Sequence, residues 1–421
     1  MTGQPSIQQH SILMDEVHSL TIQSLNNGIQ NGFCWIRNIN QFLLNIAGQG
    51  NAWGASWRAT NISHVAINDL DATSHWAVRG MPIKTQYPCP SGKDCNIRVD
   101  ETMANQSMVI SCPNQTTNGV IPKCTFYCTA TTTGCGTVQL FTTNSPAVSL
   151  FLDTASNAGF VLNADASGLK SQQKTINISC TVPYACQKST FVVSGYDDAS
   201  LLCEDDYSCE EAEFNISGFS NSAKILANAQ SLTNAKLAFR SGSYLSVVSE
   251  NTISVGQAFQ SSHWSFHSIA RIDFACTFEN DCKNAIFEST HVTELAAICG
   301  TTENNARYTC FGAQFNNYEN SSLTLQCKGD DSCIDVNVTY DGDEEYNTHC
   351  EIDCELSQQE FYHANCVNMT ITVENNQRGY DALALFCKAD QSYESCYGIT
   401  VKCGESDYIC SCPVQYDLDT G

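Results

Sequence analysis

The chain has 421 residues, of which 42% are hydrophobic and 25 are cysteine, and its formal net charge is −24. A charge this negative argues against nucleic acid and anionic membrane surfaces as partners. No stretch approaches the roughly 18 consecutive apolar residues that a membrane-spanning helix needs. The cysteines lack the CxxC pairs and histidine spacings of zinc sites, so they predict a disulfide framework and an extracellular or cell-surface location.

The first 88 residues carry the start of a repeat. The opening Met1–Pro5 segment has neither the basic region nor the apolar run of a signal peptide. We therefore expect either that a leader is missing from this sequence or that Met1 is not the biological start. The apolar pairs Leu20/Ile22, Leu44/Ile46 and Val65/Ile67 recur at intervals of 24 and 21 residues. Residues 1–88 are predicted to form N-terminal rungs, including a docking or capping segment.

Two further features of this region bear on function. Three of the five tryptophans, Trp35, Trp53 and Trp57, lie here, as an aromatic cap for the first rung or as a platform for sugar stacking. An odd number of cysteines leaves at least one thiol outside the disulfides of a single chain. Cys34 is the candidate for a free or intermolecular thiol, because its nearest cysteine in the sequence is Cys89.

From Cys89 onward the cysteines recur with a spacing of 23 residues, which random placement would produce about once or twice. Eight pairs have this spacing: Cys89/Cys112, Cys112/Cys135, Cys180/Cys203, Cys186/Cys209, Cys276/Cys299, Cys310/Cys333, Cys327/Cys350 and Cys387/Cys410. Repeats this short and rich in Ser, Thr and Asn predict a solenoid, in which each rung buries its apolar face against its neighbours. We expect residues 89–421 to continue the first part as one solenoid body.

Within a rung, turn-forming residues separate two cysteines six apart, as in Cys203–Cys209, and an alternating segment follows. Eleven residues after the first cysteine stand Phe191, Phe214, Phe287 and Val338, and two residues earlier stand Ala212, Ala285 and Val336. A second alternating segment ends two residues before the next cysteine, at Ile110, Ile178, Leu201, Ala297, Leu325 and Leu385. A period of two predicts short strands with one buried face and the same apolar column in rung after rung.

The pairing of the cysteines stays open at this stage. Parallel strands lie about 4.8 Å apart, so cysteines one full rung apart would lie within bridging distance. Pairings between consecutive cysteines, such as Cys203/Cys209 across a corner or Cys186/Cys203 across the longer interval, compete with this one. The framework residues are Cys89, Cys95, Cys112, Cys180, Cys186, Cys203, Cys209, Cys276, Cys282, Cys299, Cys310, Cys327, Cys333, Cys350, Cys387 and Cys410.

This pattern of cysteine, acidic turn, cysteine, small residue and aromatic strand resembles the cysteine-rich, right-handed parallel β-helix repeats of proteins secreted by protists and algae. These are similar in fold to pectin-lyase-like proteins. The resemblance covers Cys89 to Cys412 and implies an all-β, right-handed parallel β-helix solenoid with rungs of roughly 23 residues. It concerns the fold far more than any activity.

N-glycosylation sequons occur at Asn61, Asn105, Asn114, Asn177, Asn215, Asn320, Asn337 and Asn368. Their number is about what the composition gives by chance, so their placement matters more. Asn177, Asn215 and Asn337 fall between inward-facing positions and should point outward, where a glycan can be attached.

Acidic clusters such as Asp205/Asp206, Asp330/Asp331, Asp341–Glu345 and Asp417/Asp419 supply oxygen ligands that Ca²⁺ prefers. None fits an EF-hand loop or a glycine-rich calcium nonapeptide repeat, and solvated acidic corners are the favoured interpretation. We therefore expect no cofactor and no metal site, with Ca²⁺ as the weaker alternative.

A catalytic role on a β-helix would be that of a polysaccharide lyase or glycoside hydrolase. The candidate bases Arg98, Arg240, Arg271 and Arg307 form no recurring cluster with inward carboxylates, and no Gly-His-Gly or Arg-x-Lys pair is present. His263 and His267 lie in an alternating segment, not on a zinc-binding helix. We expect no catalytic residues.

The sequence thus predicts an extracellular structural glycoprotein, a self-assembling subunit of a filament or surface coat. Because a solenoid leaves open strands at its ends and Cys410–Gly421 contains no capping helix, end-to-end stacking of copies is expected. The alternative is a carbohydrate-binding adhesin, and a polysaccharide lyase or hydrolase is less favoured.

Overall fold

The structure is a computed structural model of the whole chain. Before residue 100 it describes the strands alone. After residue 100 it describes residues 108–112, 123–128, 135–136, 138–154, 158–169, 173–228, 230–249, 257–301, 307–320, 322–328, 331–342, 349–355, 365–374, 382–388, 396–403 and 414–417.

The chain divides into two compact units, Met1–Asp197 and Asp198–Gly421. The strands of the first unit are β1 (Ile7–Gln8), β2 (Ser11–Asp15), β3 (Ser19–Leu25), β4 (Ile29–Gln30), β5 (Phe33–Ala47), β6 (Ser56–Asp69), β7 (His75–Val78), β8 (Thr85–Pro88), β9 (Cys95–Val99), β10 (Met108–Ser111), β11 (Lys123–Cys128), β12 (Val138–Thr143), β13 (Ala147–Leu152), β14 (Val161–Asp165), β15 (Thr175–Cys180) and β16 (Thr190–Ser194). The predicted division at residue 88 stays a prediction.

The strands of the second unit are β17 (Asp198–Cys203), β18 (Glu213–Ser217), β19 (Ser222–Ala227), β20 (Lys236–Ser249), β21 (His263–Cys276), β22 (Ile286–Thr290), β23 (Glu294–Cys299), β24 (Gln314–Asn320), β25 (Ser322–Lys328), β26 (Cys333–Ile334), β27 (Asn337–Gly342), β28 (His349–Glu355), β29 (Cys366–Val367), β30 (Thr370–Glu374), β31 (Ala382–Lys388), β32 (Cys396–Tyr397), β33 (Thr400–Cys403) and β34 (Val414–Asp417).

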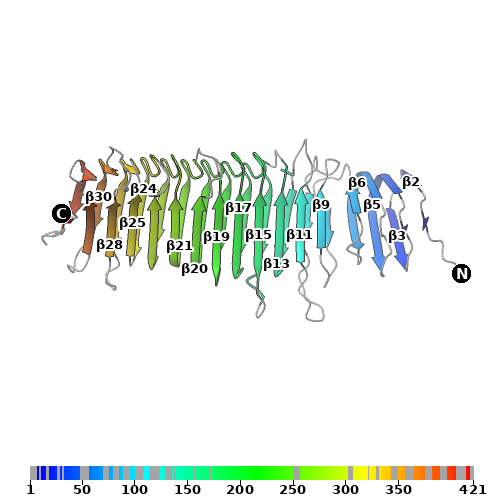
Figure 1. Ribbon diagram of the computed structural model, residues 1–421. Coiled ribbons are helices and arrows are strands. Elements are labelled where there is room, and N and C mark those ends of the chain that lie inside the picture. Colours follow the sequence, from blue (N-terminus) through cyan, green and yellow to red (C-terminus); the bar gives the residue numbers. More distant parts are fainter. Residues whose placement is uncertain are drawn as a thin grey trace. The chain divides into compact units, whose positions relative to one another are not determined.

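In each unit the paired strands run parallel, and the predicted all-β solenoid fold is confirmed. The second unit contains two main stacks (Figure 1). Stack A comprises β17, β19, the second half of β20, the second half of β21, β23, β25, β28, β31 and β34. Stack B comprises β18, the first halves of β20 and β21, β22, β24, β27, β30 and β33.

The rungs are longer and less uniform than the cysteine spacing indicated, and they average about 27 residues. Glu213 lies beside Lys236, a step that equals the predicted cysteine interval. Asn337, in contrast, lies beside Thr370, a much longer step along the chain. The register tolerates this variation because extra residues enter the connections between strands, where they displace no side chain of the apolar columns.

The alternation predicted from the sequence reproduces the observed core. One column of stack B runs through Phe214, Leu237, Trp264, Phe287, Phe315 and Val338, all buried. The rings of Phe287 and Phe315 stack with centroids 4.7 Å apart. Neighbouring strands place like side chains directly above one another, so a parallel stack converts the repeat into continuous columns.

The described disulfides close corners within a rung, so the alternative in which bridges join cysteines of successive rungs is wrong for them. Four bridges follow the six-residue alternative: Cys180–Cys186, Cys203–Cys209, Cys276–Cys282 and Cys327–Cys333. The other described bridges span 7 to 12 residues: Cys112–Cys124, Cys128–Cys135, Cys299–Cys310, Cys354–Cys366 and Cys387–Cys396.

The regular cysteine interval arises because whole disulfides are stacked. Cys276 lies beside Cys299 and Cys299 beside Cys327, so first cysteines form one column of the solenoid. Cys350, predicted to belong to the framework, instead holds a buried thiol beside Leu323, in a core position. Cys89 and Cys410 lie outside the described residues, and of Cys95 only the strand backbone is described.

One corner of the second unit has the same backbone conformation in successive rungs. It follows the stack B strands and carries positive φ angles of 68°, 54°, 54°, 55° and 52° at Gly218, Ser241, Ser268, His291 and Glu319. The left-handed region suits glycine and is uncommon for glutamate. The amide N–H groups of Gly218 and His291 donate to the carbonyl oxygens of Arg240 and Tyr318 in the next rung. We call this column of residues the left-handed corner.

Candidate assembly surface

The outer face of stack A carries an unbroken row of apolar side chains. Register places Leu202, Leu226, Val248, Ala275 and Ile298 side by side on five successive strands. Each points away from the core and is half-buried, because its neighbours along the row cover its sides. At a strand spacing of about 4.8 Å, such a row is about 20 Å long. We call these five residues the apolar row.

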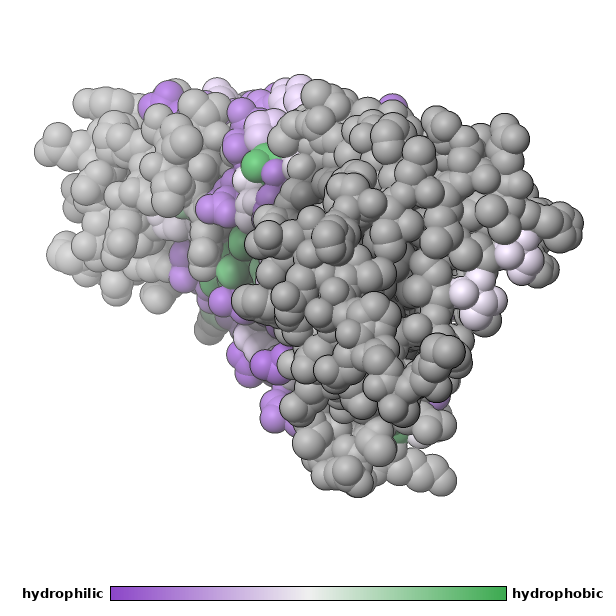
Figure 2. Space-filling model, turned by 90° about the vertical axis from the view of Figure 1, so that its right-hand side faces the viewer, coloured by the Kyte–Doolittle hydropathy of each residue, from purple (hydrophilic) through white to green (hydrophobic). Residues whose placement is uncertain are grey.

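The row extends into polar residues toward the C-terminal strands. Ile298 lies beside Gln326, Gln326 beside Asp353, and Asp353 beside Phe386. The apolar character therefore belongs to the strands from β17 to β23. Figure 2 views the molecule from one side, where most of the coloured residues are hydrophilic and a few apolar ones lie between them. A continuous apolar row contrasts with such a surface.

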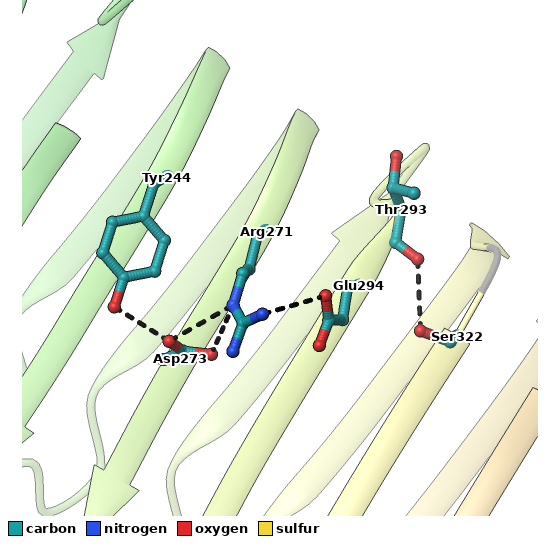
Figure 3. A network of polar contacts seen from close by, with 6 residues as sticks. All are labelled: Tyr244, Arg271, Asp273, Thr293, Glu294 and Ser322. Atoms are coloured by element: carbon teal, nitrogen blue, oxygen red, sulfur yellow. Dashed lines mark hydrogen bonds and ion pairs between the residues drawn. The ribbon is translucent and has the colours of Figure 1, made fainter. Parts of the chain in front are cut away.

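Beside the apolar row, a polar network links three successive strands (Figure 3). Arg271 donates from Nε to Asp273 Oδ1 at 3.1 Å and from Nη1 to Glu294 Oε2 at 3.4 Å. The Tyr244 hydroxyl donates to Asp273 Oδ2 at 2.8 Å. Further along the same face, His349 Nε2 lies 3.3 Å from Glu351 Oε2. On this face Arg271 thus pairs with two carboxylates, one on its own strand and one on the next.

The network also bears on the catalytic alternative. The hydrogen bond to Asp273 raises the pKa of Arg271, and the charges of Asp273 and Glu294 act in the same direction. A lyase base must release its proton, and this environment opposes that release. Hydrogen bonding to Asp273 likewise raises the pKa of Tyr244. Both groups therefore serve better as fixed donors than as bases.

Of the other candidate bases, Arg240 and Arg307 have described side chains, and neither joins this network. Arg240 is exposed on β20, at the end of its stack B segment, and Arg307 lies in a connection before β24. Arg98 lies in β9, where the strand backbone alone is described. Among the described side chains, the structure thus brings together Arg271 and two carboxylates but neither Arg240 nor Arg307.

The described sequons lie on outward positions. Asn177 is exposed in β15, Asn215 in β18 and Asn337 in β27. Asn368 is exposed just before β30. In the second unit these asparagines lie on stack B or at its entrance. Asn105 and Asn114 are outside the described residues, as are the side chains of Asn61 and Asn320.

The acidic clusters do not converge among the described residues. The amide of Asp206 donates to Asp205 Oδ1 at 2.8 Å, so this pair forms a local turn. Asp331 is buried and Asp341 lies one residue before the end of β27, whereas Asp330, residues 343–345 and the side chains of Asp417 and Asp419 lie outside the description. Within the described part, the groups whose ligand atoms already converge consist of cysteines of neighbouring disulfides. The Ca²⁺ alternative stays a prediction.

Aromatic side chains on the outer surface of the first unit pair with each other. Tyr127 and Phe151 stack with centroids 4.9 Å apart and planes 8° apart. Each ring covers a face of the other, which leaves less area for a sugar to stack on. The side chains of Trp35, Trp53, Trp57 and Cys34 lie outside the described part of the chain.

The register brings together two histidines that lie far apart in the sequence, His267 and His291. His263 and His267 share a strand yet bind different neighbours. His263 Nε2 lies 3.1 Å from Glu288 Oε2, and His267 packs against His291 of the next rung. Sequence reasoning missed His291 because the length of the turn between β21 and β22, not local spacing, aligns the two.

No family model, curated protein or solved structure matches the chain. The resemblance to repeats of secreted protist and algal proteins therefore rests on the repeat pattern, and it stays a prediction. None of the described residues form a helix that is long and apolar enough to cross a membrane.

Proposed function

We propose that this chain is an extracellular structural glycoprotein whose copies associate into a filament or a surface coat. A disulfide-rich parallel β-solenoid fits an extracellular structural or adhesive role. Between a structural and an adhesive role, the apolar row on stack A is the observation that favours the structural role. A continuous row of apolar side chains on the outer face of a sheet is typical of a contact surface.

The occupant of this surface is a second copy of the chain. When two copies face each other about a two-fold axis along the strand direction at Val248, the apolar row meets itself. The same arrangement places Lys224, exposed on β19, opposite the partner's Asp273. Because Arg271 and Tyr244 already bind Asp273, the added lysine contributes orientation more than affinity.

End-to-end stacking supplies the second contact. The final described strands, β33 and β34, continue the parallel ladders of β30 and β31. A parallel ladder can accept a further strand through its backbone N–H and C=O groups. Glycans at Asn215, Asn337 and Asn368 would occupy stack B and leave stack A bare for lateral contact.

Sedimentation velocity on the oxidised protein tests the proposal. Leu226→Asp places a carboxylate in the contact between the apolar rows of two copies, where its burial is unfavourable. The variant should therefore not associate through stack A, and monomers or single filaments should remain. Ala238→Asp is the matched control, since it places the same charge at a half-buried outward position on stack B. Equal association of wild type and Leu226→Asp, or equal loss in Ala238→Asp, would argue against this surface.

A further inference from the structure

We propose that His267, His291 and Glu319 form a site for a divalent transition-metal ion of the Zn²⁺ or Cu²⁺ class on the left-handed corner. The inference does not depend on self-assembly. It starts from three side chains that are far apart in the sequence and come from three successive rungs.

The register of stack B brings these residues together. His267 on β21 lies beside Thr290 on β22, and Thr290 lies beside Tyr318 on β24. The next residue along each rung belongs to the left-handed corner, namely Ser268, His291 and Glu319. His291 and Glu319 therefore occupy the same place in adjacent rungs, and the His291 amide donates to the Tyr318 carbonyl at 3.3 Å.

The two imidazole rings lie close to each other on the outer surface. The imidazole rings of His267 and His291 have centroids 5.5 Å apart and planes 70° apart. Two imidazoles that bind one metal through nitrogens at about 2.1 Å hold their centroids about 5 Å apart. The nitrogens of the two rings do not yet converge, so binding requires the exposed His267 ring to rotate about its side-chain bonds until a nitrogen of each ring faces one point.

Glu319 completes the arrangement. Its Oε2 lies 2.9 Å from His291 Nε2, which leaves Nδ1 of His291 available for an ion. A carboxylate on the second nitrogen of a ligating histidine fixes the ring and raises its basicity, as in many zinc proteins. The side chains of His291 and Glu319 are 50% and 56% exposed, so water can fill the remaining coordination positions.

The donor set selects the class of ion. Imidazole nitrogens suit Zn²⁺, Cu²⁺ and Ni²⁺, whereas Ca²⁺ requires several oxygen ligands. The net charge of −24 raises the local concentration of any cation near the protein.

The chain provides its own control. His263 and Glu288 form a similar imidazole–carboxylate pair at 3.1 Å, with 44% and 46% exposure, on β21 and β22 of the same stack. It differs from the proposed site in the second imidazole, which the described ring contacts place beside His291 and not beside His263. If substitution at His291 weakens metal binding and substitution at His263 does not, the ion binds at the proposed site and is not merely attracted to any exposed histidine.

The test is a Cu²⁺ titration of the full oxidised chain followed by electron paramagnetic resonance, with Zn²⁺ titrations by calorimetry. We expect one Cu²⁺ with hyperfine coupling to imidazole nitrogens. His291→Asn, chosen because asparagine tolerates a positive φ, should weaken Zn²⁺ binding at least tenfold and reduce the nitrogen coupling. Glu319→Gln should weaken it by about 10-fold to 100-fold.

His263→Asn should leave both signals unchanged, and Ca²⁺ should not displace the bound ion. Unchanged Zn²⁺ binding in His291→Asn, or an equal loss in His263→Asn, would overturn the proposal. Circular dichroism of each variant establishes that the solenoid is intact. A folded His267→Asn variant that keeps full affinity would overturn the proposal as well.

Discussion

Asp281 lies in the corner that the Cys276–Cys282 disulfide closes, and its protonation provides a direct test of how that corner contributes to the free energy of unfolding. Its carboxylate is buried between two rungs and accepts hydrogen bonds from the Ala258 amide at 3.0 Å and the Phe278 amide at 2.9 Å. It lies where the cysteine columns are interrupted. Val248 lies beside Ala275, so Ser249 takes in β20 the place that Cys276 takes in β21. In the rung of β20, where serine stands in place of the first cysteine of a disulfide, the hydrogen bonds of the Asp281 carboxylate connect that rung to the next.

Burial raises the pKa of Asp281 from 3.8 to about 6, even though hydrogen bonds from Ser249 and from backbone amides oppose the change. The folded protein therefore holds the proton more tightly than the unfolded chain does. The contribution of Asp281 to stability is fully present below about pH 4 and is lost as the pH rises through about 6. The loss amounts to about 3 kcal/mol of unfolding free energy.

The assay is equilibrium unfolding of the oxidised wild type and of Asp281→Asn between pH 3.5 and 7.5. Asparagine does not titrate, so the difference in unfolding free energy between the two proteins isolates Asp281. We expect the wild type to lose about 3 kcal/mol relative to the variant between about pH 4 and pH 6, and nothing further above that. An unfolding free energy of the wild type, relative to the variant, that is independent of pH or that rises with pH would refute the assignment.

Three other predictions concern the core, the disulfides and the glycans. Trp264→Ala should lower the unfolding free energy by about 3–5 kcal/mol in chemical denaturation, because the fully buried ring contacts Phe287 and other aromatic rings; a loss below about 1 kcal/mol would contradict this packing. Peptide mapping of the unreduced protein should recover Cys276 linked to Cys282, and a link from Cys276 to Cys299 would contradict the observed pairing. Expression in a eukaryotic secretory host should yield glycopeptides containing Asn215 and Asn337, and unmodified peptides at both would contradict their outward placement as acceptors.

The sequence predicted the core better than the connections. Phe214, Phe287 and Val338 were assigned to one inward column from their phase alone, and they lie in one column of the stack and are buried. A period of two is a property of each strand by itself, so it is unaffected by changes in the length of a rung. The length of a rung depends on residues outside the strands, and the period does not reveal it. Where a longer rung separates Asn337 from Thr370, the inserted residues lie in the connections, which cysteine spacing does not measure.

The disulfide pairing shows the same limit from another side. Cys276 and Cys299 do stack one strand apart, as the spacing indicated, but their Sγ atoms bond across the corner to Cys282 and Cys310. The distance between strands permits bridges between rungs as well as bridges across a corner, and the direction of the cysteine side chains decides between them. The spacing of cysteines in the sequence indicates which cysteines lie on neighbouring strands, but it does not indicate the direction of their side chains.

The candidate sites depend on register, which no short motif encodes. The apolar row places Leu226 beside Val248 and Val248 beside Ala275, residues that have no common sequence signature. His267 and His291 likewise meet because two strands align. An explicit alignment of rungs by strand phase, applied to the outward positions as well as the inward ones, would have found both.

Cryo-electron microscopy of the oxidised, glycosylated protein tests the central claim most directly. The account predicts filaments or sheets in which parallel strands repeat at about 4.8 Å, with stack A faces in contact and stack B faces toward solvent. Single, monodisperse particles at every concentration, or contacts made through stack B, would contradict it.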